Sequence, residues 1–238
     1  MKPSPVGSWT EEMEVMANHI KENAINKGTL RILEAGCGTM WGLDLEGVTY
    51  VLTGVDIDKD ALELRKNNSR DLDICILGDL RSVILRDDYY DVIYSSYVLE
   101  HIEGAERVME NFARWLKSGG IIVLRIPNRD SVRGFLTRIT PFWVHVLYTK
   151  YVLRDKNAGR PGYAPFPTFF DSIVSRKGIY EFCNKCCLLI RAEYSRKLAL
   201  TKKQPLFVLE GLIIYFFNII SLSFLSRHNI LIYIIEKK

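Results

Sequence analysis

The chain has 238 residues, of which 48% are hydrophobic and 25% are charged, so it suits one α/β domain with insertions or two small domains. The net charge of +4 is mild, and the basic residues concentrate only modestly in 125–203, where they interleave with acids. We therefore expect no nucleic-acid partner, and a basic surface near anionic lipid stays open.

The five cysteines are an odd number, and Cys183, Cys186 and Cys187 crowd together. This argues against a disulfide framework and for a reducing, cytoplasmic compartment. No second pair of cysteine or histidine residues lies at ligand spacing, so we expect these cysteines to pack in a helix and to bind no metal. The N-terminal stretch "MKPSPVGSWTEEMEVM" has no apolar core, which excludes a secretory signal.

The predicted elements begin with a capping-box pattern, Ser8 and Glu11, followed by apolar residues at helical spacing. This predicts a helix over residues 10–26. Five apolar runs then read as strands, separated in two places by a helical pattern. The strands are "TLRILEAG", "YVLTGVDID", "DICILGDL", "YDVIYSS" and "GGIIVLRIPN", and the helices are "KDALELRKNN" and the amphipathic "EGAERVMENFARWLKSGG".

After residue 174 the alternation resumes with the helix "SRKGIYEFCNKC" and the strands "LLIRAEYS" and "NILIYIIEKK". Alternating strands and helices with short connections predict an α/β fold, a mostly parallel Rossmann-like sheet with helices on both faces. We take residues 1–238 as one domain.

Residues 129–174 interrupt the alternation and are rich in aromatic residues, arginine and proline. We expect an insertion, partly helical around 132–153, that acts as a lid over the site. Its aromatic candidates for the lid are Phe135, Phe142, Trp143, Tyr148 and Tyr151.

A second insertion, residues 200–227, is apolar and precedes the last strand. Its segment 206–225 carries a single charge, Glu210, and has the length of a membrane span. Glu210 and several small or polar residues count against a span. A helix that touches a membrane or covers the substrate and a helix packed in the core both remain open.

The stretch "LEAGCGTM" places Gly36 and Gly38 directly after the first sheet strand. A dinucleotide site needs a third glycine where Trp41 stands, and a P-loop needs a Gly-Lys-Ser/Thr sequence that is missing. Glu34 would repel a pyrophosphate but suits a cationic amine. S-adenosylmethionine carries an α-ammonium and a sulfonium, so this turn favours that ligand over a phosphate.

Two further acidic residues follow the next two strands. Asp56 can accept both hydroxyls of a ribose, and Asp79 can accept from an adenine amine while Leu80 offers an apolar surface to the ring. Ligands of open α/β sheets bind at the carboxyl ends of the strands, where these residues stand. A nicotinamide dinucleotide would also use Asp56, so the combination of Glu34 and Asp79 favours S-adenosylmethionine.

With "EAGCGT", "GVDID", "GDL" and "YDVIYSSYVLEHIEGAERVMENFARWLKSGGIIVLRIPN" in this order, the sequence resembles the class I S-adenosylmethionine-dependent methyltransferases. The last stretch looks especially like the branch with quinone-biosynthesis and small-molecule enzymes. The resemblance implies a seven-stranded sheet whose last strand, "NILIYIIEKK", runs antiparallel between the fifth and sixth.

The same resemblance assigns residues to the methyl donor by position. They are Glu34, Gly36, Cys37 and Gly38 for the methionine part, Asp56 and Ile57 for the ribose, Asp79 and Leu80 for the adenine, and Ser95, Ser96 and Tyr97 between donor and acceptor. The family often has glycine where Met40 stands. With Met40 and Trp41 there, we expect a short first helix after the glycine turn.

Methyl transfer needs alignment of nucleophile, methyl and sulfur, and it needs a general base only when the nucleophile must lose a proton. His101 is the candidate base or orienting residue, with a structural histidine as the alternative. Tyr97, Trp143 and His145 are candidate acceptor contacts. Two apolar insertions above the donor predict a hydrophobic or amphiphilic small-molecule acceptor, unless they only pack together or form a dimer interface.

We therefore expect methylation of oxygen first and of carbon next. The alternative is a non-catalytic, membrane-associated nucleoside-binding scaffold of the same fold, with peripheral membrane contact through 206–225. A nucleic-acid methyltransferase is disfavoured because "SSYV" stands where an Asn/Asp-Pro-Pro-aromatic signature would follow the fourth strand.

Overall fold

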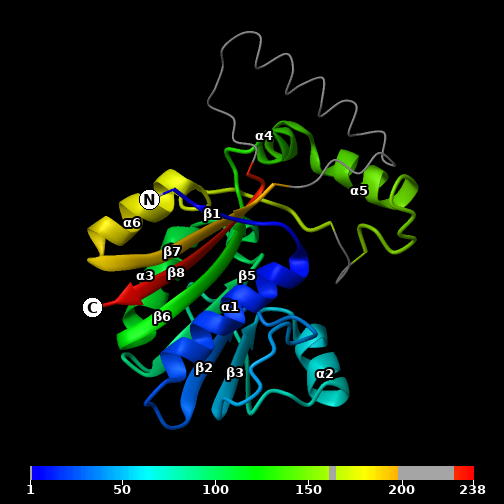
Figure 1. Cartoon of the computed structure of the whole chain (residues 1–238). Coiled ribbons are helices and arrows are strands. Elements are labelled where there is room, and N and C mark those ends of the chain that lie inside the picture. Colours follow the sequence, from blue (N-terminus) through cyan, green and yellow to red (C-terminus); the bar gives the residue numbers. More distant parts are fainter. Residues whose placement is uncertain (1, 161–164, 198–227) are drawn as a thin grey trace.

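The computed structural model describes residues 2–160, 165–197 and 228–238 (Figure 1). The elements in chain order are β1 (Ser4–Val6), α1 (Trp9–Ala24), β2 (Leu30–Ala35), β3 (Tyr50–Asp56), α2 (Lys59–Asn68), β4 (Ile74–Leu77), β5 (Tyr90–Ser96), the 3-10 helix η1 (Leu99–His101), α3 (Ala105–Trp115), β6 (Leu116–Pro127), α4 (Val132–Ile139), α5 (Phe142–Tyr151), α6 (Arg176–Lys185), β7 (Leu188–Arg196) and β8 (Ile230–Lys237).

The strands form one sheet of eight in the order β1-β7-β8-β6-β5-β2-β3-β4. β8 lies between β6 and β7 and is antiparallel to both, while the other neighbouring strands pair in parallel. The predicted α/β class and the antiparallel last strand are confirmed.

The expected strand count of seven is wrong by one, because β1 adds an eighth strand at the edge beside β7. β1 is three residues long and contains Pro5, which pairs in register with Ser195. So short a strand carries no periodic pattern in the sequence, and proline is tolerated only at such an edge.

One face of the sheet is covered by α1, which begins after the N-cap Ser8, as the capping box predicts. The Ser8 hydroxyl accepts a hydrogen bond from the backbone N–H of Glu11 at 3.0 Å. Met16 and Ile20 of α1 are fully buried in a cluster with alternate residues of the central strands, among them Val123 of β6. The helix therefore closes one apolar layer of the sheet.

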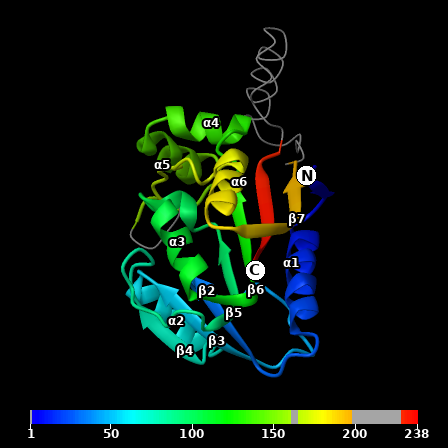
Figure 2. The same ribbon diagram turned by 90° about the vertical axis from the view of Figure 1, so that its left-hand side faces the viewer.

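The opposite face is covered by α3 and α6 (Figure 2). Phe112 and Trp115 of α3 and Phe182 of α6 pack in one cluster with the other alternate set of strand residues, among them Leu124 of β6 and Tyr233 of β8. Helices on both faces are what the alternating pattern predicts.

The segment 36–49 between β2 and β3 contains no helix, so the expectation of a short first helix after the glycine turn is wrong. Leu43 and Leu45 are buried in the α1 cluster as parts of an extended loop. Gly47 has φ +84°, a conformation that favours glycine and breaks a helix. Burial of these two leucines thus takes the place of a helical turn.

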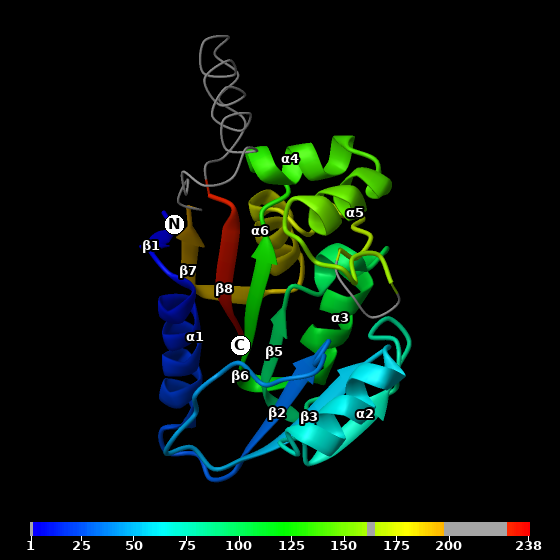
Figure 3. The same ribbon diagram turned by 90° about the vertical axis from the view of Figure 1, so that its right-hand side faces the viewer.

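The expected helical part of the 129–174 insertion forms two helices, α4 and α5, separated at Pro141. Figure 3 shows both helices beyond the carboxyl ends of β5 and β6, which are the arrowhead ends. The insertion 200–227 lies outside the described residues. Among the described helices, none combines the length and hydropathy that crossing a membrane requires.

All five cysteines are free, as the sequence predicts. Cys183 of α6 is buried in the α3–α6 cluster, so the prediction that it packs in a helix is confirmed, whereas for Cys187, which follows the helix and is exposed, it is wrong.

Candidate functional site

The glycine turn folds back over the end of β3. The backbone N–H groups of Gly36 and Cys37 both donate to the carbonyl oxygen of Val55, at 2.8 and 3.2 Å. Gly36 has φ +74°, and a Cβ added there would lie 2.3 Å from Cγ2 of Val98. Only glycine fits this position, because both the backbone angle and the neighbouring side chain exclude a larger residue.

Arg65 of α2 binds the backbone of the glycine turn. Its side chain is fully buried, its guanidinium donates to the carbonyl oxygen of Cys37, and it pairs with Glu34 at 2.7 Å and with Asp71 at 3.0 Å. One cation therefore connects the end of β2, the turn and the loop after α2.

Sequence reasoning missed Arg65 because "KDALELRKNN" reads as an exposed charged helix. A signal was present, since Arg65 follows the buried Leu62 by three residues and so shares its helix face.

Glu34 faces Arg65, and its predicted contact with a donor ammonium stays a prediction. Burial raises the pKa of Glu34 to about 8, while its hydrogen bond and ion pair with Arg65 lower it. Burial also raises the pKa of the neighbouring Cys37 thiol to about 12. Cys37 is therefore a neutral packing residue of the turn.

Asp56 stands at the end of β3 with its carboxylate held by two backbone N–H groups. Its Oδ2 accepts from Gly38 at 2.7 Å, and its Oδ1 accepts from Asp58 at 2.9 Å. Each oxygen keeps a further lone pair for a ligand, which suits two vicinal hydroxyls. Ile57 beside it is 71% exposed, as an apolar residue available for ligand contact would be.

Asp79 and Leu80 follow β4, the edge neighbour of β3. Arg81 forms an ion pair with the Asp79 carboxylate, with Nη2 2.6 Å from Oδ2. The hydrogen bonds from Arg81 lower the pKa of Asp79. Leu80 is buried, and its carbonyl oxygen accepts from Asn111 Nδ2 at 2.8 Å. An adenine amine would have to share Asp79 with Arg81.

The corner after β5 holds Ser95, Ser96 and Tyr97. Tyr97 has φ +57°, a strained angle for a non-glycine residue, of a kind that clusters at functional sites. Its backbone N–H donates to the carbonyl oxygen of Arg125 at 2.9 Å, and the Arg125 guanidinium lies 4.3 Å from the centre of its ring. Arg125 in turn forms a buried ion pair with Glu12 of α1.

Neither Arg125 nor Glu12 stood out in the sequence. Each is a single charge within an apolar pattern, and nothing local signals that the two meet 113 residues apart.

His101, in η1 just beyond this corner, lies with its Nδ1 2.7 Å from the carbonyl oxygen of Pro167. The carbonyl can only accept, so Nδ1 carries the proton and Nε2 carries the lone pair. Burial lowers the pKa of His101, which keeps the ring neutral near pH 7. Phe166 packs edge-on against the imidazole, 5.8 Å between ring centres. The tail of the insertion thus folds over His101.

Glu100, the preceding residue, is 3% exposed, and burial raises its pKa to about 8. Its Oε2 has no hydrogen-bond partner among the described residues, and its Oε1 lies 3.8 Å from His101 Nε2. A buried carboxyl without a partner is costly unless it is neutral. Sequence reasoning missed Glu100, although its place beside His101 in "VLEHIEG" was visible.

The predicted acceptor residues Trp143 and His145 lie on α5. His145 Nε2 is 2.8 Å from Thr140 Oγ1 and 3.2 Å from the carbonyl oxygen of Thr137, so the ring closes the turn between α4 and α5. Trp143 is 63% exposed. Acceptor contact by either residue stays a prediction.

The predicted donor residues do meet at one edge. β5, β2, β3 and β4 are neighbours in the sheet, and their carboxyl ends bring together the Ser95–Tyr97 corner, the glycine turn, Asp56 and the Asp79–Leu80 pair. A Cβ added at Gly38 would meet no atom within 4 Å, so bare backbone faces open space beside the Asp56 carboxylate. These residues fit a nucleoside with an attached amino acid, the build of S-adenosylmethionine.

Comparison with known proteins agrees with this geometry. Residues 33–124 match the model of a methyltransferase domain. A mitochondrial ubiquinone biosynthesis O-methyltransferase of Candida albicans is 28% identical over 148 residues, which are 56% of this chain and 45% of the relative. A probable S-adenosylmethionine-dependent methyltransferase of Mycobacterium tuberculosis is 31% identical over 113 residues, 47% of this chain and 41% of the relative. The chain thus spans less than half the length of these two relatives.

Solved structures share the fold at low sequence identity. An S-adenosylmethionine-dependent methyltransferase from Archaeoglobus fulgidus has a TM-score of 0.55 and 18% identity, covering 95% of this chain and 94% of its own. The [4+2]-cyclase SpnF has a TM-score of 0.54 and 13% identity, covering 97% and 82%. The matched domain over residues 33–124, the relatives and the sheet topology support the class I S-adenosylmethionine-dependent methyltransferase family, whose cofactor is S-adenosylmethionine.

Proposed function

We propose that the protein transfers a methyl group from S-adenosylmethionine to an oxygen atom of a small, apolar or amphiphilic acceptor, with carbon as the second choice of nucleophile. The observation that carries the proposal is the Asp56 carboxylate, fixed by the N–H groups of Gly38 and Asp58 beside the glycine turn. It supports a ribose site where the strand ends converge.

The donor supplies an activated methyl group on a sulfonium. As the sulfur–methyl bond breaks and the oxygen–methyl bond forms, the acceptor hydroxyl must release its proton. His101 is the residue that can take it, because the Pro167 carbonyl orients Nδ1–H and leaves Nε2 as the acceptor. Since burial lowers the pKa of His101, the ring is neutral and ready to accept at pH 7.

The walls around His101 support an apolar acceptor. Phe166 packs against the imidazole, and the N–H of Phe169 donates to the carbonyl oxygen of Glu100 at 2.8 Å; both side chains, from the end of the insertion, are about half-exposed. Aromatic side chains held at a site by backbone hydrogen bonds exclude water and bind flat or aliphatic groups. Relatives named as ubiquinone O-methyltransferases are consistent with an oxygen nucleophile on such an acceptor.

The fold also supports other chemistry, as the [4+2]-cyclase neighbour illustrates, so methyl transfer needs a direct test. Calorimetry with S-adenosylhomocysteine is the first arm. Asp56→Asn should weaken binding at least about tenfold by loss of charge-assisted hydrogen bonds, while Asp60→Asn, an exposed carboxylate on α2, should leave it unchanged.

The second arm incubates the protein with radiolabelled methyl donor and a lipid extract. Label in an alkali-stable apolar product supports the proposal. Donor binding without transfer to any extract supports the non-catalytic scaffold, and absence of donor binding overturns both.

A further inference from the structure

The helix α5 is apolar around its circumference and yet has no buried residue. A helix of this composition is normally buried in a core or in lipid. Trp143, Leu147 and Tyr151 follow one another at every fourth position and so share one side of the helix. The exposed apolar residues of α5 and the two positions after it, here called the α5 face, are Phe142, Trp143, Leu147, Tyr151, Val152 and Leu153.

Positive charge is concentrated in the insertion that carries the α5 face. Residues 129–160 hold seven basic and two acidic residues, a net charge of +5, whereas the whole chain carries +4. The rest of the chain is therefore slightly acidic, and the excess of positive charge lies in this insertion. The arginine and lysine side chains between residues 138 and 156 are all exposed, and they are Arg138, Lys150, Arg154 and Lys156.

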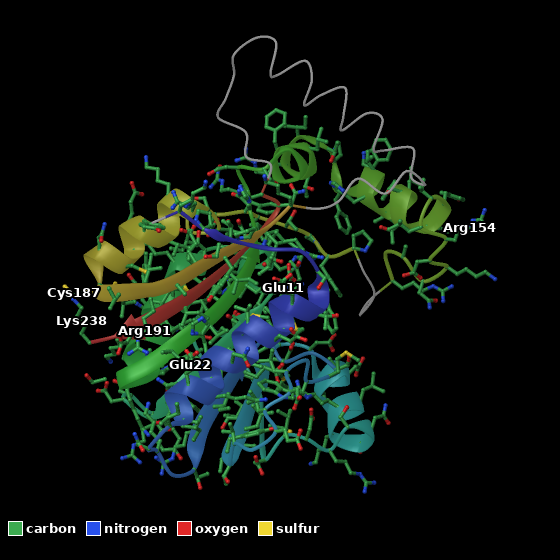
Figure 4. The ribbon with its side chains drawn as sticks, in the orientation of Figure 1. Glu11, Glu22, Arg154, Cys187, Arg191 and Lys238 are labelled. Atoms are coloured by element: carbon green, nitrogen blue, oxygen red, sulfur yellow. The ribbon has the colours of Figure 1, made fainter. Side chains whose placement is uncertain are left out.

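These cations are available to a partner. Within the described part of the chain no ion pair involves Lys150 or Arg154, and neither residue has an unstated interaction. Lys150 lies 5.8 Å from the centre of the Tyr151 ring, next to the apolar residues. Figure 4 shows Arg154 directed away from the molecule at the end of α5.

We propose that the α5 face binds the surface of an anionic lipid bilayer, with the aromatic and aliphatic side chains among the acyl chains and the basic side chains at the headgroups. Tryptophan and tyrosine prefer the membrane interface, and basic residues beside them gain from an anionic surface. A nucleic acid would bind the basic side chains but would leave the aliphatic residues of the α5 face exposed. A basic protein would be repelled by the same positive charge.

The test uses the full chain with vesicles of phosphatidylcholine alone or mixed with phosphatidylglycerol, without methyl donor or acceptor. Its outcome is therefore independent of the proposed methyl transfer. We expect binding to the anionic vesicles that weakens as salt is added. Binding to neither kind of vesicle overturns the proposal.

Two pairs of variants locate the binding. Lys150→Gln with Arg154→Gln should lower the partition coefficient about 25-fold, fivefold for each charge, and Trp143→Ser with Tyr151→Ser should lower it about tenfold or more. The matched controls are Lys59→Gln with Lys66→Gln and Leu64→Ser, exposed positions on α2 at the other end of the molecule (Figure 1). These controls should bind as the unmodified protein does.

Tryptophan fluorescence gives an independent readout. Vesicles should shift the emission to the blue, and Trp143→Phe should abolish most of the shift while binding persists. Of the other three tryptophans, Trp115 is already buried, and Trp9 and Trp41 lie outside the insertion, on α1 and in the loop before β3. Vesicle binding that survives both α5 variants would assign the lipid contact to another segment, such as residues 198–227, and overturn the proposal. Loss of a dimer in the Trp143→Ser, Tyr151→Ser variant without any vesicle binding would likewise assign the face to a second copy and overturn it.

Discussion

Arg65 Nη2 lies 2.7 Å from Glu34 Oε2, and the two side chains are only 0% and 6% exposed. The same guanidinium also holds Asp71 and the Cys37 carbonyl. A buried cation with this many partners makes the glycine turn depend on α2, the helix that carries Arg65.

Replacing Arg65 by Met should therefore destabilise the fold by about 3–5 kcal/mol, because the buried carboxyl of Glu34 and the partly buried Asp71 lose their counter-charge. The double variant Arg65→Met, Glu34→Gln should lose less unfolding free energy than the sum of the two single losses. The reason is that Glu34→Gln removes one of the charges left without a partner. Urea denaturation of the two single variants and the double variant measures this, with the exposed Lys66→Met as control. Additive losses would contradict the coupling.

Gly36 and Gly38 allow strain and steric clash to be separated. Both have positive φ, but only at Gly36 would a Cβ meet Val98. Gly38→Ala should cost about 1–2 kcal/mol of unfolding free energy from backbone strain alone. Gly36→Ala should cost at least about 1 kcal/mol more, through overpacking. Adding Val98→Ala to Gly36→Ala should recover the difference, and no recovery would mean that the clash is not the cause.

His101→Gln should lower kcat for an oxygen acceptor by about 100- to 10,000-fold, the usual range for a lost general base. Affinity for S-adenosylhomocysteine should not change. Because burial lowers the pKa of His101 below its ordinary 6.5, the base stays neutral and activity should persist at pH values below 6.5 before it falls. An unchanged kcat and pH profile in the variant would assign His101 a structural role.

Glu100 predicts a pH dependence of stability. Burial raises its pKa from 4.5 to about 8, so between these values the folded protein binds a proton that the unfolded chain has released. The contribution of Glu100 to the free energy of unfolding is therefore largest below pH 4.5. It is lost as the pH rises through 8, by up to about 1.4 kcal/mol per pH unit.

Glu100→Gln should flatten that part of the profile. Urea denaturation at several pH values checks it, with the exposed Glu103→Gln as control. If the profiles of Glu100→Gln and the unmodified protein coincide, the carboxyl of Glu100 does not titrate in this range.

Local patterns were enough to predict much of this molecule. The glycine turn, Asp56 and the antiparallel β8 follow from short stretches whose residue types and order have few alternatives, and all are where the sequence placed them. Whether Asp56 binds a ribose remains a prediction.

Other features depend on distant parts of the chain. Segment 36–49 is an extended loop because Leu43 and Leu45 pack against α1, a contact that no local pattern encodes. His101 is oriented by Pro167, which is 66 residues away. Helix spacing places Arg65 on the face of Leu62, but it does not tell that Glu34, Asp71 and the Cys37 carbonyl would meet its guanidinium.

The position of β8 has a consequence for how the protein is made. β7 and the N-terminal edge strand β1 join the rest of the sheet only through β8, which is the last described strand along the chain. During synthesis, β6 and β7 must wait with unpaired inner edges until residues 230–237 leave the ribosome. Open, apolar strand edges recruit other chains. A nascent chain paused before residue 230 should therefore engage chaperones strongly, and the addition of β8 should join β7 and β1 to the rest of the sheet.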